Sequence, residues 1–260
     1  MILDRLRVSP DARRFYLVLG CLILVAWGLL FAWQTSAYAD LLGHESIGDD
    51  GLPPAGRLAA FLLSWFLMIV AMMLPGSLPL LSHAIQPVWH RMKSRRLIGW
   101  IIFGYLYPWI LIGLLSYLGD SFLHQMFDPA APLAAYSDWI APAIVLSAGL
   151  YQFTPVKRSY MARCRSSQVQ FPEGRMQKLS SAVALKHGLR LGVFCVGSCW
   201  SLMMLMFALG HHRLDWMLAL GGIMAAERLA PWGHRLAWLV GFGLVVWATF
   251  WVLTSQHWLV

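Results

Sequence analysis

Apolar stretches long enough to cross a lipid bilayer recur along most of this chain and restrict it to membrane-spanning folds. Of the 260 residues, 59% are hydrophobic and only 12% are charged, a composition far from that of a soluble domain. We therefore predict an all-α, polytopic transmembrane bundle that forms a single integral membrane domain over residues 1–260. Its seven expected spans are roughly 15–34, 57–81, 97–118, 139–154, 189–209, 214–230 and 236–254.

The basic residues fall on one side of these spans. Every Lys and Arg except Arg57 and Arg213 lies at the N-terminus or near the connections that follow the second, fourth and sixth spans. Because cytoplasmic loops are enriched in Lys and Arg, the pattern predicts a cytoplasmic N-terminus, a cytoplasmic basic segment at 156–188 and an external C-terminus. Topology and attraction to anionic lipid then explain the net charge of +8, and we expect no nucleic-acid partner.

The first span has a second interpretation. Ala37-Tyr38-Ala39 follows an apolar run and resembles a signal-peptidase site, and cleavage there would leave six spans. The run from Phe15 to Trp33 is longer than the usual apolar region of a signal peptide, which is about 7–15 residues. We therefore expect the first span to be retained.

The fifth expected span is rich in sulfur. Cys195, Cys199, Met203 and Met206 recur at helical spacing and share one face of a helix. Thiols and thioethers in a water-poor helix are the ligands that Cu(I) prefers, and they can hold it with two or three donors. Zn(II) would require four closed positions that often include His, and this span contains no His.

The second expected span could supply further ligands. Met68 and Met72 lie one helical turn apart in it, beside Met73. At about 1.5 Å per residue, Met72 lies roughly 13 Å from the inner end of its span and Cys199 roughly 15 Å from the inner end of the fifth. The two spans could therefore meet in a copper site formed by Cys195, Cys199, Met68, Met72 and Met203.

A second interpretation explains the same cysteines and methionines by helix packing, without a metal ion. Small residues one turn apart let transmembrane helices approach closely, so Gly188, Gly192, Cys195 and Cys199 could form a packing seam. Methionine is also a common filler of apolar cores. Spacing alone leaves both interpretations open.

Glu227 is the only acidic residue in the interior of an expected span, since Asp215 lies at the outer end of the sixth, and a carboxylate there marks a functional site by default. We include it among the candidate metal-site residues, with a role in metal entry, proton balance or thiol ionisation. The alternative is a structural ion pair. Lys157 or Arg165 could be its partner in either case.

Four blocks of sequence occur in an order and spacing that resemble a known family. They are Trp65 to Pro75, Tyr151 to Lys157 with Cys164-Arg165, Cys195 to Met204, and Trp216 to Glu227. The chain is similar to the predicted metal-binding integral membrane proteins, a bacterial family of largely unassigned function. The resemblance implies copper handling in the bacterial inner (cytoplasmic) membrane. Ser198 stands where the family tends to carry a third thiol, which weakens an all-thiolate site.

We found none of the common motifs of hydrolases, phosphate-binding enzymes, metalloproteases or haem proteins, so we do not expect an enzyme. The sequence favours a protein that binds Cu(I) and either transports it or delivers it, as a chaperone, to a membrane oxidase or another membrane cuproenzyme. The alternative is a non-metal accessory subunit of a larger membrane complex. In both cases Cys164, in the basic segment, is expected to be solvated and to matter less than Cys199.

Overall fold

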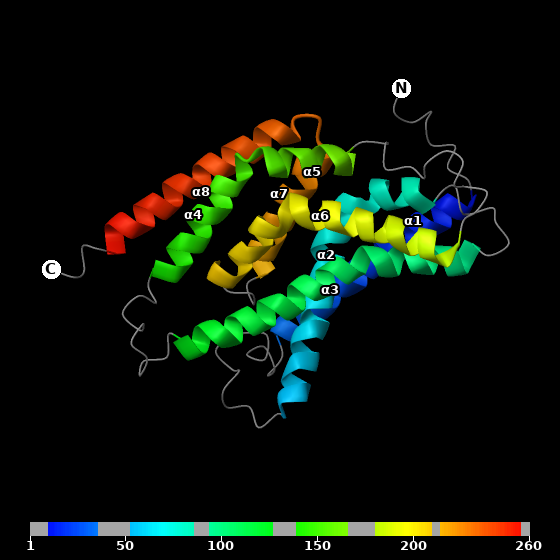
Figure 1. Cartoon of the computed structure of the whole chain (residues 1–260), viewed down its shortest axis with the longest axis horizontal. Helices are drawn as coiled ribbons and strands as arrows, with labels where there is room; N and C mark the ends of the chain where they lie inside the picture. Colours follow the sequence, from blue (N-terminus) through cyan, green and yellow to red (C-terminus); the bar gives the residue numbers. More distant parts are fainter. Residues whose placement is uncertain are drawn as a thin grey trace.

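The computed structural model describes residues 10–35, 53–85, 94–126, 139–165, 180–209 and 214–255. Within these ranges the chain forms eight α-helices and no strands, which confirms the predicted all-α class (Figure 1). The helices are α1 (Pro10–Gln34), α2 (Pro54–Ile85), α3 (Ser94–Met126), α4 (Ile140–Gln152), α5 (Pro155–Arg165), α6 (Ser181–Leu209), α7 (Leu214–Leu229) and α8 (Gly233–Ser255).

Five helices, α1, α2, α3, α6 and α8, are long and apolar enough to cross a membrane. The other two expected spans correspond to α4, with 13 residues, and α7, with 16. Both are shorter than the roughly 20 residues that usually span a bilayer. The total of seven spans and their orientation therefore stay predictions, and the Ala37-Tyr38-Ala39 site lies outside the described residues.

The most extensive helix pairing joins α3 to α6, and the next joins α4 to α8. Figure 1 shows α4 and α8 side by side, away from the group formed by α1, α2 and α3. Glycines allow the close approach of α3 and α6, because a Cβ at Gly104 would lie 2.5 Å from the Leu185 carbonyl oxygen and one at Gly188 would lie 2.2 Å from that of Ile101. The predicted seam of small residues therefore exists.

Two prolines interrupt the hydrogen bonding of α2. Pro75 has no N–H and cannot bond to the carbonyl of Ala71 one turn earlier. The indole Nε1 of Trp27 donates to that carbonyl instead, at 3.2 Å, and so joins α1 to α2. This substitute donor satisfies a backbone group that would otherwise be costly to leave unpaired in a lipid environment.

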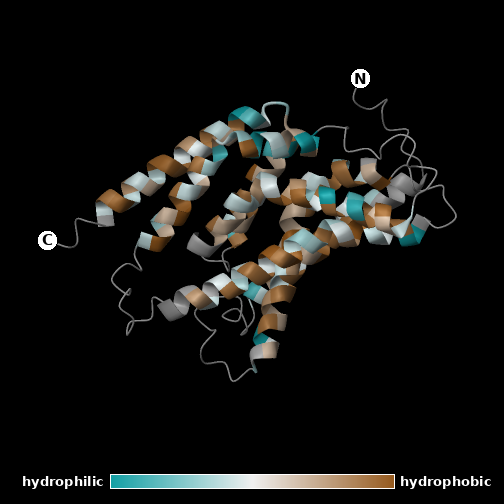
Figure 2. Ribbon diagram, in the orientation of Figure 1, coloured by the Kyte–Doolittle hydropathy of each residue, from teal (hydrophilic) through white to brown (hydrophobic). Residues whose placement is uncertain are grey.

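Thr154-Pro155 separates α4 from α5. Thr154 Oγ1 accepts a hydrogen bond from the Lys157 backbone N–H at 3.3 Å, which caps α5, and Pro155 takes the first helical position. The predicted solvated segment 156–188 thus contains a helix, and its last part, from Ser181, belongs to α6. Figure 2 shows hydrophilic residues gathered on α5 and at the start of α8.

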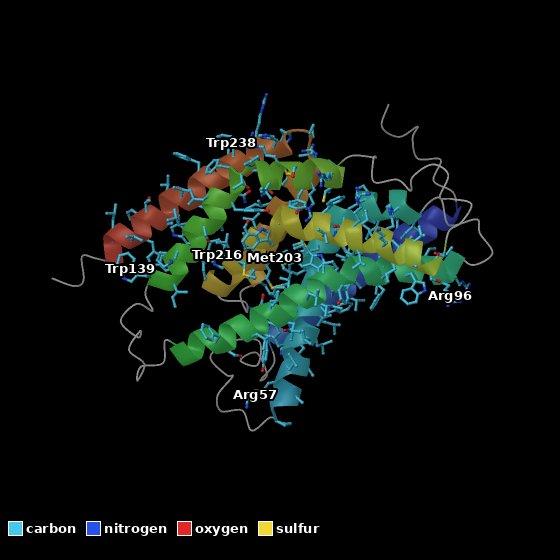
Figure 3. The ribbon with its side chains drawn as sticks, viewed as in Figure 1. Arg57, Arg96, Trp139, Met203, Trp216 and Trp238 are labelled. Atoms are coloured by element: carbon cyan, nitrogen blue, oxygen red, sulfur yellow. The ribbon has the colours of Figure 1, made fainter. Side chains whose placement is uncertain are left out.

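The core lies where α2, α3, α6 and α7 meet, and it is rich in sulfur. Met73, Cys195, Met203 and Met206 are completely buried there. Figure 3 shows Met203 in the interior of the bundle. Side chains at the outer faces of α1 and α8 are mostly apolar and exposed, as expected for surfaces in contact with lipid.

Candidate metal-binding site

Cys195 and Cys199 lie one turn apart on α6 and are both buried. The Cys195 Sγ is 3.1 Å from the Tyr105 hydroxyl of α3 and 3.5 Å from the Ser77 hydroxyl of α2. The Tyr105 hydroxyl also donates to Ser77 at 2.8 Å. Side chains from two neighbouring helices therefore hold the first thiol in place.

The second thiol contacts a thioether. The Cys199 Sγ lies 3.5 Å from Met73 Sδ and 3.0 Å from the Cys195 carbonyl oxygen. Met73 of α2 and Cys199 of α6 thus contact each other, as expected of the second and fifth spans.

Met73, rather than Met72 or Met68, is the methionine of α2 that contacts the thiol. Met72 is buried against α7, where its side chain lies 3.5 Å from the position of a Cβ added at Gly221. Neighbouring residues on a helix point about 100° apart, so Met72 and Met73 face different partners. Met68 and Met203 are buried in the same core cluster.

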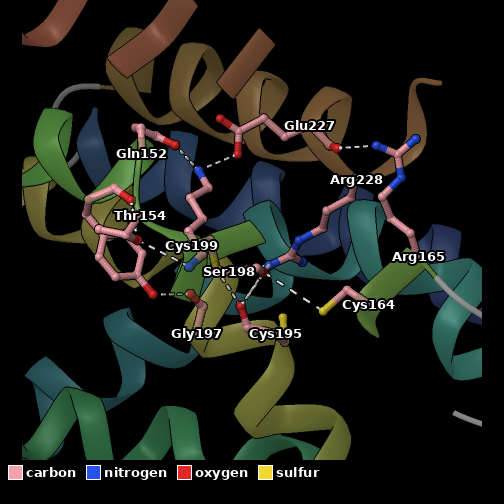
Figure 4. A network of polar contacts seen from close by, with 12 residues as sticks. Gln152, Thr154, Cys164, Arg165, Cys195, Gly197, Ser198, Cys199, Glu227 and Arg228 are labelled. Carbon is pink, nitrogen blue, oxygen red and sulfur yellow. Dashed lines mark hydrogen bonds and ion pairs between the residues drawn. The ribbon is translucent and has the colours of Figure 1, made fainter. Parts of the chain in front are cut away.

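Arg228 is the principal site residue that the sequence analysis missed. It lies in the last turn of α7, is only 8% exposed, and reaches the thiols through its guanidinium (Figure 4). Its Nη2 donates to Cys199 Sγ at 2.9 Å, to Ser198 Oγ at 2.9 Å and to the Cys195 carbonyl at 3.0 Å. The sequence signal that could have identified Arg228 is its position next to Glu227 on an apolar helix.

Glu227 points toward a different group. Its Oε2 forms an ion pair with Lys157 Nζ at 2.7 Å, and Lys157 also donates to Gln152 Oε1. Lys157 is completely buried, and this burial lowers its pKa, while the Glu227 carboxylate raises it. One of the two expected partners of Glu227 is therefore confirmed, and the ion pair joins α5 to α7.

The second expected partner, Arg165, binds the end of α7 instead of the carboxylate. Its guanidinium donates to the backbone carbonyls of Glu227, at 3.4 Å, and Ala230. Lys157 and Arg165, two of the four basic residues of α5, thus hold the last turn of α7. This anchoring places Arg228, the next residue after Glu227, against α6.

Cys164 is not a solvated thiol, contrary to expectation. It is half-buried on α5, and its Sγ lies 4.0 Å from Ser198 Oγ beside the two buried cysteines. Burial raises the pKa of Cys164 to about 11, with Arg228 opposing the shift. Cys21 of α1 is exposed and therefore provides the better control thiol.

Met73, Cys195 and Cys199 form a sulfur cluster whose donors suit a soft ion. In the described part of the chain no three His, Cys, Asp or Glu residues are grouped closely enough to hold a metal ion. Any ion in the cluster would thus rely on two thiols and a thioether, a donor set that favours Cu(I) over Zn(II).

A family model described as PpoB2, copper chaperone, matches residues 62–251. The matched segment contains every residue of the sulfur cluster and both members of the Lys157–Glu227 ion pair. The search of curated proteins and the search of solved structures returned no match.

Proposed function

We propose that this chain, which belongs to the PpoB2 family of copper chaperones, a non-enzymatic metal-handling class, binds Cu(I) as cargo. The ion would be held by the thiols of both Cys195 and Cys199, inside a membrane-embedded bundle. The observation that supports this proposal is the contact between Cys199 Sγ and Met73 Sδ at 3.5 Å, next to a second buried thiol. Met73 would serve as a weak third ligand. Cargo held in this way can be passed to another protein by exchange of sulfur ligands.

The burial of the site favours the reduced ion. Cys195, Cys199 and Met73 are at most 1% exposed, so a bound ion would be shielded from water. Cu(I) needs few ligands, whereas hard cations require carboxylate, carbonyl or water oxygens. The only described carboxylate near the thiols, that of Glu227, is already paired with Lys157.

The remaining expected ligands have other proposed roles. Met68, Met72 and Met203 are buried and, on this proposal, shape a soft, dry wall around the ion. Glu227 fixes the end of α7 through Lys157. Its other oxygen, Oε1, has no hydrogen-bond partner among the described residues and remains available to a proton or to a water molecule.

We further propose that the protein resides in the bacterial inner membrane, with seven spans and a cytoplasmic N-terminus. The five long apolar helices and the exposed apolar side chains of α1 and α8 support a bilayer location. The recipient would be a membrane oxidase or another cuproenzyme that uses the delivered copper.

Metal analysis of anaerobically purified protein tests the proposal. The wild-type protein should retain Cu(I), and Cys199→Ala should lose most of it, because only one thiol and a thioether would remain. Cys195→Ala should show a similar loss. Cys21→Ala removes an exposed thiol on α1 and should leave the copper content unchanged.

Two results would replace this proposal with the accessory-subunit alternative. One is full copper stoichiometry in the Cys195→Ala/Cys199→Ala double variant. The other is a wild-type protein that binds no copper above background while remaining folded, which circular dichroism would show. Co-purification with a larger membrane complex would then be the expected behaviour.

A further inference from the structure

Arg228 is a buried cation without an acidic partner. No carboxylate in the described part of the chain forms an ion pair with it, although it is only 8% exposed. Its guanidinium instead contacts the hydroxyls of Ser77 and Ser198, a carbonyl and the Cys199 sulfur. A buried charge is costly unless it is paired, so the arrangement needs a source of negative charge.

The nearby ion pair cannot provide that charge. Glu227 and Lys157 are 2.7 Å apart and neutralise each other. The groups that contact Arg228 are neutral in their ordinary forms, except that a thiol becomes anionic when it loses its proton to bind a metal. The negative charge can therefore come from the metal-binding thiols themselves.

We propose that Arg228 is a specificity-determining residue that makes the site prefer a monovalent ion. This inference rests on the proposed function, in which Cys195 and Cys199 hold the ion. Two thiolates and one monovalent ion carry a net charge of −1, which the guanidinium balances. Two thiolates and a divalent ion carry no net charge, so the buried cation of Arg228 would remain uncompensated.

The geometry holds the guanidinium in place for this role. Nη1 donates to Ser77 Oγ at 3.1 Å while Nη2 donates to α6, so the group bridges α2 and α6. The stem of the arginine passes close to Gly76, where an added Cβ would lie 3.3 Å from Arg228 Cδ. Arginine remains charged at all accessible pH values, so the compensating charge is permanent.

A comparison of Ag(I) binding with Hg(II) binding separates the effect of ionic charge from the effect of softness. Both are soft ions that form linear dithiolate complexes, and they differ by one unit of charge. We would measure the binding of Cu(I), Ag(I) and Hg(II) by competition with a small dithiol, in wild type, Arg228→Gln and Arg228→Lys. Arg228→Gln should weaken binding of the two monovalent ions by about 10–100-fold relative to Hg(II), the range typical of groups that support metal ligands. Arg228→Lys keeps the charge and should retain most of the preference.

A second pair of variants leaves Arg228 in place. Ser77→Asp would set a carboxylate beside Nη1 and neutralise the guanidinium, whereas Ser77→Asn is similar in size and uncharged. Ser77→Asp should lower Ag(I) affinity relative to Hg(II), and Ser77→Asn should leave that ratio near its wild-type value. This pair decides the question even if Arg228→Gln fails to fold.

The outcomes separate this inference from the proposed function. If wild type binds none of the three ions, the proposed function fails and this inference fails with it. If wild type binds them but Arg228→Gln weakens Ag(I) and Hg(II) equally, Arg228 is only a structural tie between helices. An unchanged Ag(I) to Hg(II) ratio in Ser77→Asp would likewise overturn the charge argument.

Discussion

At the scale of single residues, the last turn of α7 directs two opposite charges to different partners. Glu227 pairs with Lys157, and Arg228 enters the sulfur cluster. Neighbouring helical residues point about 100° apart, which lets adjacent side chains serve separate functions. The consequence is that α5, although basic and largely at the surface, reaches the interior of the bundle through Lys157.

The Lys157–Glu227 pair should show strong energetic coupling. Glu227→Met leaves a buried ammonium without its counter-ion and should cost about 3–5 kcal/mol of unfolding free energy, as should Lys157→Met. The double variant Lys157→Met/Glu227→Met should cost much less than the sum, because an apolar pair needs no charge compensation. Equilibrium unfolding in mixed micelles, followed by circular dichroism, measures these energies.

Lys186→Met serves as the matched control for that cycle, since Lys186 is exposed on α6. It should change the unfolding free energy little. Additive costs in the double variant would show that Lys157 and Glu227 do not stabilise each other.

At the scale of elements, the α3–α6 contact supports both interpretations of the fifth expected span, which corresponds to α6: a packing seam and a cluster of sulfur ligands. Gly188 and Gly192 pack against α3, as the seam predicts, and Cys195 continues that line to meet Tyr105. Close packing is therefore what brings the Tyr105 hydroxyl within 3.1 Å of the thiol. The seam and the sulfur cluster are parts of one interface.

Widening this interface should affect both stability and copper binding. A methyl group from Gly104→Ala would lie 2.5 Å from the Leu185 carbonyl and force α3 away from α6. We expect a loss of roughly 1–3 kcal/mol in unfolding free energy. We also expect weaker copper binding, because Tyr105 follows Gly104 and would shift away from Cys195.

Gly99→Ala is the matched control on α3, since an added Cβ there has no atom within 4 Å. It should preserve copper binding and leave stability unchanged or slightly higher, because Ala favours helix. Equal effects of the two substitutions on copper affinity would contradict the role of the α3–α6 contact.

At the scale of the whole molecule, the topology depends on α4 and α7. Both are short, and both lie beside α8 or the sulfur cluster rather than in isolation in lipid. Neighbouring helices can shield the ends of short helices. The charge pattern favours counting both as spans, with basic residues on the cytoplasmic side.

Reporter fusions test this topology. Fusions at the N-terminus and between α5 and α6 should report the cytoplasm, and a fusion after Val260 should report the external side. A cytoplasmic signal at Val260 would mean an even number of spans. A cleaved N-terminal segment would appear as a shortened mature protein in mass spectrometry.

The sequence by itself determined the all-α class, the approximate positions of seven of the eight described helices and the choice of Cys195 and Cys199 as candidate ligands. Long apolar runs permit little besides membrane helices, because backbone groups in lipid must bond within their own helix. Lys157 was also one of the two predicted partners of Glu227, since a carboxylate in an apolar helix needs a cation. These features depend on local pattern and on charge alone.

Only the tertiary structure decided that Met73 meets Cys199, that Arg228 enters the site and that Cys164 lies beside Ser198. Periodicity shows which residues share a helix face, but it does not show which face meets which neighbour. That choice depends on the rotation of each helix about its axis, and here on the prolines of α2 and the anchoring of α7 by α5. These constraints come from contacts between residues far apart in the chain, which no local pattern records.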